Sequence, residues 1–236
     1  MKYINLPDTQ THRLSFYLAM EEYVARYSGE QDAFFMWQVE PTVIIGRNQA
    51  LQQEVDTDYC RQHGIAVFRR KSGGGCVYAD RDNLMLSFVA QGDNVGLLYN
   101  RFMNMLLLVL RRMGVEATGT SHNDVLIGQR KVSGTAVYHL PGHCIAHATL
   151  LYDTNMEHML HAITPGAEKL RPKGIRSVDQ RITLLKDHTR MSLDEVKTCI
   201  RQSLCDGERT LTAAETAAIG EMEQDYLEKR FINLIL

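Results

Sequence analysis

The densest group of chemically capable residues lies between positions 69 and 75, where three cations precede three consecutive glycines. The segment reads Arg-Arg-Lys-Ser-Gly-Gly-Gly from Arg69 to Gly75. Backbone amides without neighbouring side chains can surround a phosphate or a carboxylate, and arginine adds charge-assisted hydrogen bonds. The spacing matches neither the G-x-x-x-x-G-K-S/T phosphate loop nor the G-x-G-x-x-G dinucleotide loop. The segment therefore predicts an anion-binding loop, with an ordinary charged hairpin as the alternative.

A second group of polar residues surrounds Lys131, just after a hairpin turn predicted at Gly128-Gln129. A lysine held on a strand can place its ammonium against a carboxylate and an α-phosphate together, which would stabilise the formation of an acyl-adenylate. Asp124 could orient that lysine or hold a magnesium ion, because hard cations prefer oxygen ligands. Each residue alone is more often part of a surface ion pair, so that alternative stays open.

Cys76 and Cys144 are candidate nucleophiles for an acyl group. A cysteine can play that part where a base or a positive charge lowers the pKa of its thiol. Free cysteine is more often a small buried residue, and we expect that simpler role for both.

The chain has 236 residues, 44% of them hydrophobic, and a net charge of −2. This length can bury about 70% of the unfolded surface, which predicts one large domain with a sizeable core, or such a domain with a small appendage. A weakly negative chain whose longest apolar run covers only residues 105–110 is not expected to bind nucleic acid or to span a membrane. Five cysteines without a C-x-x-C pair predict reduced thiols and a cytoplasmic protein.

Hydrophobic periodicity predicts the elements that must position these residues. A helix is expected over residues 11–27, with Glu21 and Glu22 on its polar side. A second helix is expected over residues 96–113, and its apolar face, from Leu97 to Met113, should back a sheet.

Two S/T-x-x-E capping boxes, Ser192 with Glu195 and Thr212 with Glu215, predict the starts of two further helices. Strands are expected over residues 33–39, 42–45, 66–69, 76–78, 84–89, 124–127, 131–137 and 145–152. Because strands are grouped rather than alternating regularly with helices, the predicted fold class is α+β.

Five motifs, in the same order along the chain, resemble those of the lipoate-protein ligases in the biotin/lipoate protein ligase family. The glycine loop and the residues after it are similar to the family motif R-R-x-S-G-G-G-x-V-Y/F-H-D. The other four are P-T-V-I-I-G-R-N-Q from Pro41, N-D from Asn123 with K-V-S-G-T-A from Lys131, H-A-T-L-L from His147, and K-G-I-R-S-V from Lys173. The resemblance implies a mixed, largely antiparallel sheet backed by helices, as in class II aminoacyl-tRNA synthetases and biotin/lipoate ligases, with residues 1–236 forming a single catalytic domain.

The resemblance also implies a two-step reaction and a role for each motif residue. The carboxylate of lipoate would attack the α-phosphate of ATP, and a carrier lysine would then attack the lipoyl-adenylate. Lys131 would be the catalytic residue and Asp124 the metal ligand. The residues that would bind the acyl substrate are Arg47, Arg70, Ser72, Gly73, Gly74, Gly75, Val77, Tyr78, Gly134, Ala136 and His147. Those that would bind the nucleotide are Asp80, Asn83, Asn123, Asp124, Lys131, Thr149 and Lys173.

The ligands implied by the resemblance are ATP, Mg²⁺ and lipoate, and the partners are lipoyl carrier domains of 2-oxoacid dehydrogenase E2 subunits or the glycine-cleavage H protein. The sequence departs from the family pattern at Ala79, where the motif has histidine. It also ends at Leu236, without the C-terminal accessory domain of many members, so adenylation could need a separate accessory subunit.

Two other functions stay open. An octanoyl- or lipoyl-transferase of similar fold would move the acyl group between carriers without ATP, through a cysteine thioester. In the most comparable subset that cysteine follows the H-x-S/T-L-L strand, where residues 170–174 of this chain contain no cysteine. The second alternative is a noncatalytic carrier-binding partner, for which Ala79 and the short C-terminus are the support.

Overall fold

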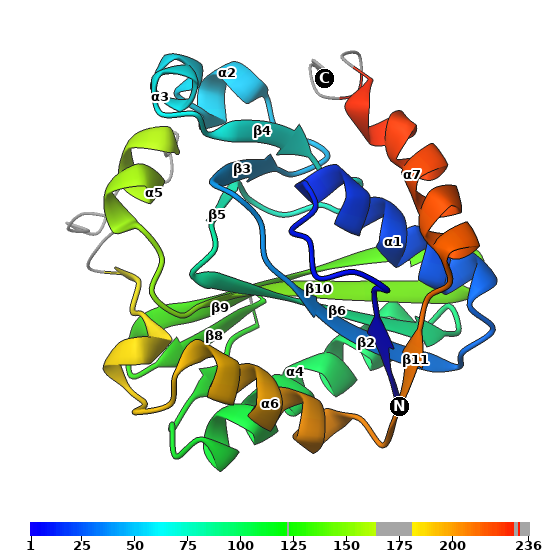
Figure 1. Cartoon of the computed structure of the whole chain (residues 1–236). Helices are drawn as coiled ribbons and strands as arrows, with labels where there is room; N and C mark the ends of the chain where they lie inside the picture. Colours follow the sequence, from blue (N-terminus) through cyan, green and yellow to red (C-terminus); the bar gives the residue numbers. More distant parts are fainter. Residues whose placement is uncertain (122, 164–180, 229–230, 232–236) are drawn as a thin grey trace.

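The structure, a computed structural model, describes residues 1–121, 123–163, 181–228 and 231 (Figure 1). The helices in this part of the chain are α1 (Leu14–Tyr27), α2 (Leu51–Glu54), α3 (Thr57–Gln62), α4 (Val95–Arg112), α5 (Met156–Ala162), α6 (Leu193–Leu204) and α7 (Ala213–Leu227). The strands are β1 (Lys2–Asn5), β2 (Asp32–Trp37), β3 (Thr42–Ile45), β4 (Ala66–Arg69), β5 (Val77–Ala79), β6 (Asn83–Gln91), β7 (Thr118–Gly119), β8 (Asp124–Ile127), β9 (Arg130–Leu140), β10 (His143–Leu151) and β11 (Gly207–Thr210).

The strands form a large and a small sheet. The large sheet has eight strands in the order β11-β1-β2-β6-β10-β9-β8-β7, and the small sheet has three in the order β4-β3-β5. The pairs from β2 to β8 are antiparallel, whereas β1 pairs in parallel with both β2 and β11. The predicted α+β class with a mixed, largely antiparallel sheet is therefore confirmed.

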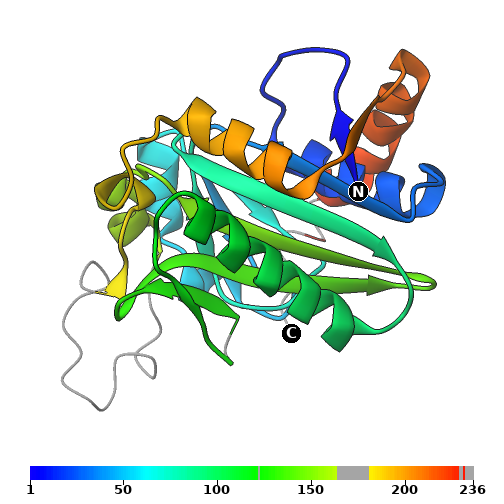
Figure 2. The same cartoon turned by 90° about the horizontal axis from the view of Figure 1, so that it is seen from below.

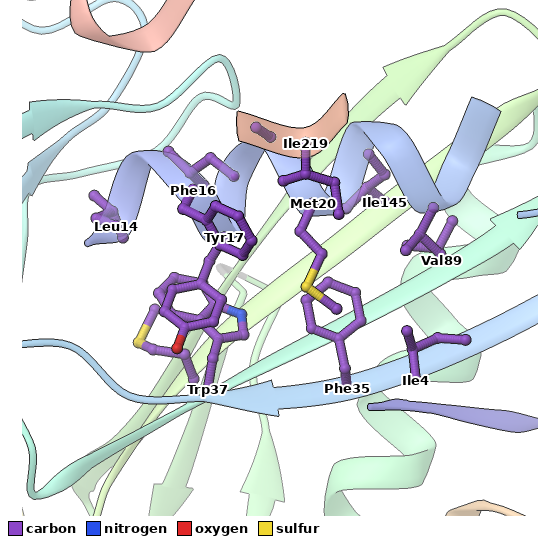
Figure 3. Close-up of a cluster of buried hydrophobic side chains, with 14 of the residues drawn as sticks. Ile4, Leu14, Phe16, Tyr17, Met20, Phe35, Trp37, Val89, Ile145 and Ile219 are labelled. Carbon is purple, nitrogen blue, oxygen red and sulfur yellow. The ribbon is translucent and has the colours of Figure 1, made fainter. Parts of the chain in front are cut away.

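Helices cover both faces of the large sheet (Figures 1 and 2). On one face α4 and α6 bury their apolar stripes, and Phe102 stacks near Phe88 of β6 with a ring-centroid distance of 6.1 Å. On the other face lie α1 and α7, where Met20 of α1 packs among Phe35 of β2 and Ile219 of α7 (Figure 3). Helices α4 and α6 each bury one face because their apolar residues recur with the helical period, whereas α1 is buried on nearly all sides.

The small sheet carries the glycine-rich loop. Its strands β4 and β5 are the two arms that flank residues 70–76, and β3 lies between them. Helices α3 and α5 pack beside this sheet around Cys60, Tyr78 and Met159. Figure 1 shows the small sheet standing over the large one, on the side of α1. The loop is therefore held between two sheets rather than on a free hairpin.

Both predicted capping boxes are confirmed. Ser192 caps α6 and Thr212 caps α7, each with its glutamate accepting from the cap backbone in return. None of the described helices combines the length and apolar character needed to cross a bilayer.

Two expectations about helix faces are wrong. Glu21 and Glu22 are only 3% and 4% exposed, because both carboxylates have buried partners on the loop and the sheet. Leu97 is 58% exposed, because α4 turns the neighbouring Leu98 toward the sheet and residues adjacent in a helix point about 100° apart.

Candidate functional site

Five residues form one row across the face of the large sheet that lies under α1. The strand register places Trp37 of β2 opposite Met85 of β6, then Thr149 of β10, Gly134 of β9 and Asp124 of β8. Residues in register on neighbouring strands share a face. Four inter-strand steps of about 4.8 Å separate the two ends, about 19 Å in all. The row therefore runs from an apolar end at Trp37 to a charged end at Asp124.

All five residues of this row line a cavity of about 240 Å³. Its apolar wall contains Leu14 and Leu18 of α1 and Ile44 of β3, and Figure 3 shows Leu14 and Trp37 on facing elements. The predicted site residues that line it are Arg70, Gly74, Gly75, Val77, Asn123, Asp124, Lys131, Gly134, Ala136, His147 and Thr149. A cavity that is apolar at one end and charged at the other suits an apolar chain with an anionic head.

A bulge in β9 brings Lys131 to the charged end. Val125 and Leu126 of β8 pair with Ser133 and Lys131, so β9 contains one extra residue there, Val132. On a regular strand, residues three apart face opposite sides, but a bulge re-aims the side chain. Lys131 Nζ then lies over Gly134, where a Cβ atom would be only 2.7 Å away, and pairs with Asp124 Oδ1 at 2.7 Å. Because Gly134 has no side chain, the ammonium of Lys131 can occupy the space above it.

Arg70 holds the glycine-rich loop from inside. Its Nη2 donates to the carbonyl oxygens of Gly73 and Gly75, both at 2.7 Å, and its Nη1 donates to that of Ile44 at 3.2 Å. Burial lowers the pKa of the guanidinium to about 10, so it remains charged at neutral pH. Arg70 is therefore a fixed positive charge in the cavity wall.

The other two cations of the loop segment do not line the cavity. Arg69 is fully buried, and its Nη1 donates to the carbonyl oxygens of Gly46 and Gln49, both at 2.8 Å. Lys71 Nζ pairs with Glu22 Oε1 at 2.6 Å. Arg69 and Lys71 therefore support the loop and its neighbouring turn instead of facing the cavity.

A chain of buried hydrogen bonds connects the apolar end of the cavity with the loop. Trp37 Nε1 donates to Ser87 Oγ at 2.8 Å, and Ser87 Oγ donates to Glu21 Oε1 at 2.6 Å. His147 Nδ1 lies 3.0 Å from Glu21 Oε2, and its Nε2 lies 2.8 Å from Ser72 Oγ. Because a carboxylate accepts, Nδ1 must donate, and the other ring nitrogen, Nε2, is left to contact the Ser72 hydroxyl.

The sequence interpretation missed several residues of the site, among them Glu21, Trp37 and Met85. The helical period predicts a polar face for Glu21, and the strand predicted over residues 33–39 includes Trp37 without a role in the site. A glutamate two helical turns after Leu14 on an otherwise apolar stripe was the available signal, because a buried acid needs a buried partner.

We expect Glu21→Gln to lower the free energy of unfolding by about 1–3 kcal/mol, because the amide puts an NH2 donor in place of one of the two carboxylate oxygens that face Ser87 and His147. Urea unfolding monitored by circular dichroism measures the change. Glu157→Gln, on the exposed side of α5, is the matched control and should change it by no more than about 0.5 kcal/mol. Equal effects of the two substitutions would contradict the role given to Glu21.

Residues 14–205 match the protein family described as the lipoyl protein ligase A/B catalytic domain. The chain belongs to this family. It is 34% identical to Lipoate-protein ligase LplJ of Bacillus subtilis over 172 residues, which are 72% of this chain and 52% of that protein. It is 32% identical to Lipoate-protein ligase 1 of Staphylococcus aureus over 191 residues, 79% of this chain and 58% of that protein. The chain therefore spans a little over half the length of these curated relatives.

A solved structure is similar over the full chain. It comes from an archaeal lipoylation system, described as a bi-partite lipoate protein ligase and its E2 lipoyl domain from Thermoplasma acidophilum. The TM-score is 0.85 at 27% identity, covering 100% of this chain and 97% of that chain. The lipoate-ligase fold expected from the sequence is thus confirmed.

Several motif residues of the lipoyl protein ligase family lie outside the cavity. Asp80 is buried and accepts from the backbone of Asp82 and of Asn155 at the start of α5, and Asn83 donates to the Tyr78 carbonyl at 3.0 Å. The remaining motif positions divide by burial, with Tyr78, Ser72 and Ala79 buried and Arg47 and Gly73 exposed. Lys173 lies outside the described residues.

Neither of the two candidate nucleophiles, Cys76 and Cys144, has a lowered thiol pKa in this member of the lipoyl protein ligase family. Cys76 lines the cavity, but burial raises the pKa of its thiol to about 12. Cys144 faces α4 on the other side of the sheet, donates to the Gly92 carbonyl at 3.3 Å, and also has a thiol pKa raised by burial. Both therefore fit the expected role of small buried residues.

The raised pKa predicts how Cys76 reacts. At pH 8 its thiolate fraction should be about a thousandfold below that of an ordinary cysteine, because each pKa unit is a factor of ten. Iodoacetamide should therefore modify Cys76 slowly in the native protein and at the ordinary rate in urea, as measured by peptide mass spectrometry. Rapid native labelling of Cys76 at pH 8 would show an activated thiol and would favour a thioester mechanism.

Proposed function

We propose that this chain catalyses the lipoate-protein ligase reaction, with a lipoyl-adenylate as the intermediate. The observation that carries the proposal is the cavity row that begins at Trp37 and ends beside Lys131 and Asp124. An apolar acyl chain would occupy the Trp37 and Met85 end, and its carboxylate would lie near the ammonium. The curated relatives that bear the name lipoate-protein ligase support the same reaction.

In the first step, a carboxylate oxygen of lipoate forms a bond to the α-phosphorus of ATP, and the bond from that phosphorus to the bridging oxygen breaks to release pyrophosphate. Negative charge accumulates on the transferring phosphoryl oxygens. Lys131, held over Gly134 by the bulge, would stabilise that charge from a fixed position. Arg70 adds a second fixed charge in the wall.

In the second step, the amine of a carrier lysine attacks the acyl carbon of the adenylate. The bond from that carbon to the phosphate oxygen breaks, AMP leaves, and the amine loses a proton as the amide forms. The same Lys131 would stabilise the oxyanion of the tetrahedral intermediate, because it already contacts the carboxyl group. No covalent intermediate on the protein is needed, which agrees with the raised pKa of the Cys76 thiol.

Mg²⁺ is the metal that the proposed reaction implies. The described residues contain no group of three or more potential ligands that could hold an ion by themselves. Mg²⁺ is commonly bound through one or two carboxylates together with substrate phosphates, and Asp124, half-buried at the charged end, fits that arrangement. When bound there with ATP, it would neutralise phosphate charge during phosphoryl transfer.

The carriers proposed for this chain are lipoyl domains of E2 subunits or the H protein. The E2 lipoyl domain named with the Thermoplasma acidophilum ligase supports the first of these. That ligase is described as bi-partite, so an accessory subunit for lipoate activation is also proposed here. Residues 1–236 are proposed to act as one catalytic domain, supported by the packing of β1, β11 and α7 onto the rest. Five free cysteines support a reducing cytoplasmic location.

The reaction is tested with purified chain, lipoate, Mg²⁺-ATP and an unmodified lipoyl domain. We expect pyrophosphate release and a carrier mass increased by one lipoyl group. Preformed lipoyl-adenylate separates the two steps: transfer from it without activity on free lipoate would identify a missing activating subunit. Transfer from an acylated carrier without nucleotide would favour the transferase instead. No modification from any of the three donors would contradict the proposed function.

A further inference from the structure

Lys71, which stands between two residues that shape the cavity, is held by a buried cluster of its own. Arg70 before it ties the glycine carbonyls together, and Ser72 after it contacts His147. Lys71 Nζ lies 2.6 Å from Glu22 Oε1, and the side chains of Lys71 and Glu22 are 25% and 6% exposed. The position of the loop is therefore coupled to a buried carboxylate on α1.

The third member of the cluster is Tyr226 of α7. Its hydroxyl donates to Glu22 Oε1, and its ring centre lies 4.3 Å from Lys71 Nζ. Tyr226 is only 3% exposed, and its pKa is raised by burial and by the Glu22 carboxylate, so it stays a donor. The ring and the hydroxyl thus approach the same ion pair from one side.

This contact is unexpected from the family match, which ends at residue 205, before α7 begins at Ala213. Figure 1 shows α7 lying along α1, opposite the sheet that forms the floor of the cavity. α7 also contacts α1 through Glu223, which accepts from Ser15 at 2.5 Å, but that contact does not involve the loop. Two contacts of one helix can therefore be compared, one that includes the loop and one that does not.

We propose that α7 is a positioning element for the glycine-rich loop, residues 70–76. This inference rests on the proposed function, in which the loop binds the acyl substrate. Tyr226 and Glu22 together hold Lys71, and Lys71 holds residues 70–75 in the conformation that lines the cavity. Three consecutive glycines make this loop costly to order, since glycine loses the most backbone freedom. Glycines have no side chains with which to fix their own backbone. The contacts of Lys71 with Glu22 and Tyr226 therefore hold the loop next to them in place.

The experiment compares Lys71→Met, Tyr226→Leu and the double variant, with Glu223→Gln as the control on the same helix. Backbone hydrogen exchange of residues 71–76 reports the order of the loop without substrate. Exchange there should be about tenfold faster in Lys71→Met and in Tyr226→Leu. It should be unchanged in Glu223→Gln, whatever that substitution does to overall stability.

Steady-state kinetics then separate positioning from general destabilisation. Each single variant should raise the KM for lipoate about tenfold and leave kcat within about twofold, and Lys71→Arg should restore most of the KM. Because Tyr226 acts through Lys71, the double variant should also show about a tenfold rise rather than a hundredfold one. Failure of the wild-type chain to use lipoate or lipoyl-adenylate would refute the proposed function, while the exchange measurement would still test the anchor.

Unchanged exchange of residues 71–76 in Lys71→Met and Tyr226→Leu would overturn the proposal. A hundredfold rise of KM in the double variant would overturn it too, because the two residues would then act independently. An equal rise of the KM for lipoate in Glu223→Gln and in Tyr226→Leu would also overturn it. The effect would then come from the packing of α7 on α1 and not from the contact with Lys71.

Discussion

Lys131→Met should reduce the rate of lipoyl-adenylate formation by about 10²–10³-fold, which is the usual effect of removing one preorganised charge donor. The ammonium lies at the charged end of the cavity row, over Gly134 and 2.7 Å from Asp124. Methionine fills a similar volume without the charge, so the bulge and the strand pairing should remain. Pyrophosphate release with saturating lipoate and ATP measures the effect.

Lys186→Met is the matched control, because Lys186 also pairs with an aspartate, Asp153, but lies outside the cavity. It should keep the wild-type rate within about twofold. The thermal unfolding midpoints of both variants should be close to that of the wild type, since surface ion pairs contribute little. Full adenylation by Lys131→Met would remove Lys131 from the mechanism.

Gly46→Ala should impair lipoate binding more than any other single-methyl addition near the loop. A Cβ atom at Gly46 would lie 2.2 Å from the carbonyl oxygen of Gly74 and 3.1 Å from its carbon. Both are backbone atoms, so the loop itself must move. The carbonyl groups on either side of Gly74 are already held, because Arg70 Nη2 donates to those of Gly73 and Gly75, so moving the loop would break these hydrogen bonds. A displacement of about 1 Å in such a site can cost about 10²-fold in kcat/KM.

Isothermal titration with lipoate and steady-state kinetics measure this effect. Gly220→Ala is the control, because it adds the same methyl group to α7 where nothing lies within 4 Å. That change should leave lipoate binding unaltered and should raise stability by about 0.5–1 kcal/mol, as for alanine in a helix interior. Wild-type affinity for lipoate in Gly46→Ala would show that the turn and the loop do not need their close approach.

Local signals in the sequence were sufficient for many of the elements. The strands at 42–45, 66–69 and 124–127 have the predicted bounds, because each is a short β-rich run between turn residues. Both capping boxes begin helices where expected, since the reciprocal hydrogen bonds involve residues only three apart. The helix predicted over residues 96–113 is α4, with Leu97 the one misjudged position of its face.

Features that depend on distant residues were not predictable. Strand β11 pairs in parallel with β1 about 200 residues away, and neither strand has enough periodic residues to be recognised alone. Glu21 and Glu22 became buried only because Ser87, His147 and Lys71 meet them from other elements. A prediction from side-chain polarity alone therefore places these two glutamates on the solvent-facing side of the helix, whereas both are buried.

Within the site, the sequence identifies the motif residues but does not predict which of their side chains face the cavity. The sequence placed Arg69, Arg70 and Lys71 together, whereas the structure turns only Arg70 toward the cavity. Alternation along β9 would have put Lys131 and Gly134 on opposite faces, and the bulge at Val132 reverses that. Such side-chain directions follow from register and tertiary contacts, which a linear pattern does not contain.

The most direct test of the cavity assignment is a crystal structure with a non-hydrolysable lipoyl-adenylate analogue. The lipoyl ring should lie against Trp37 and Met85, and Lys131 Nζ should lie about 2.7–3.2 Å from an oxygen of the acyl phosphate linkage. An analogue bound outside the row, or with its nucleotide at the Trp37 end and Lys131 still paired only with Asp124, would contradict the account.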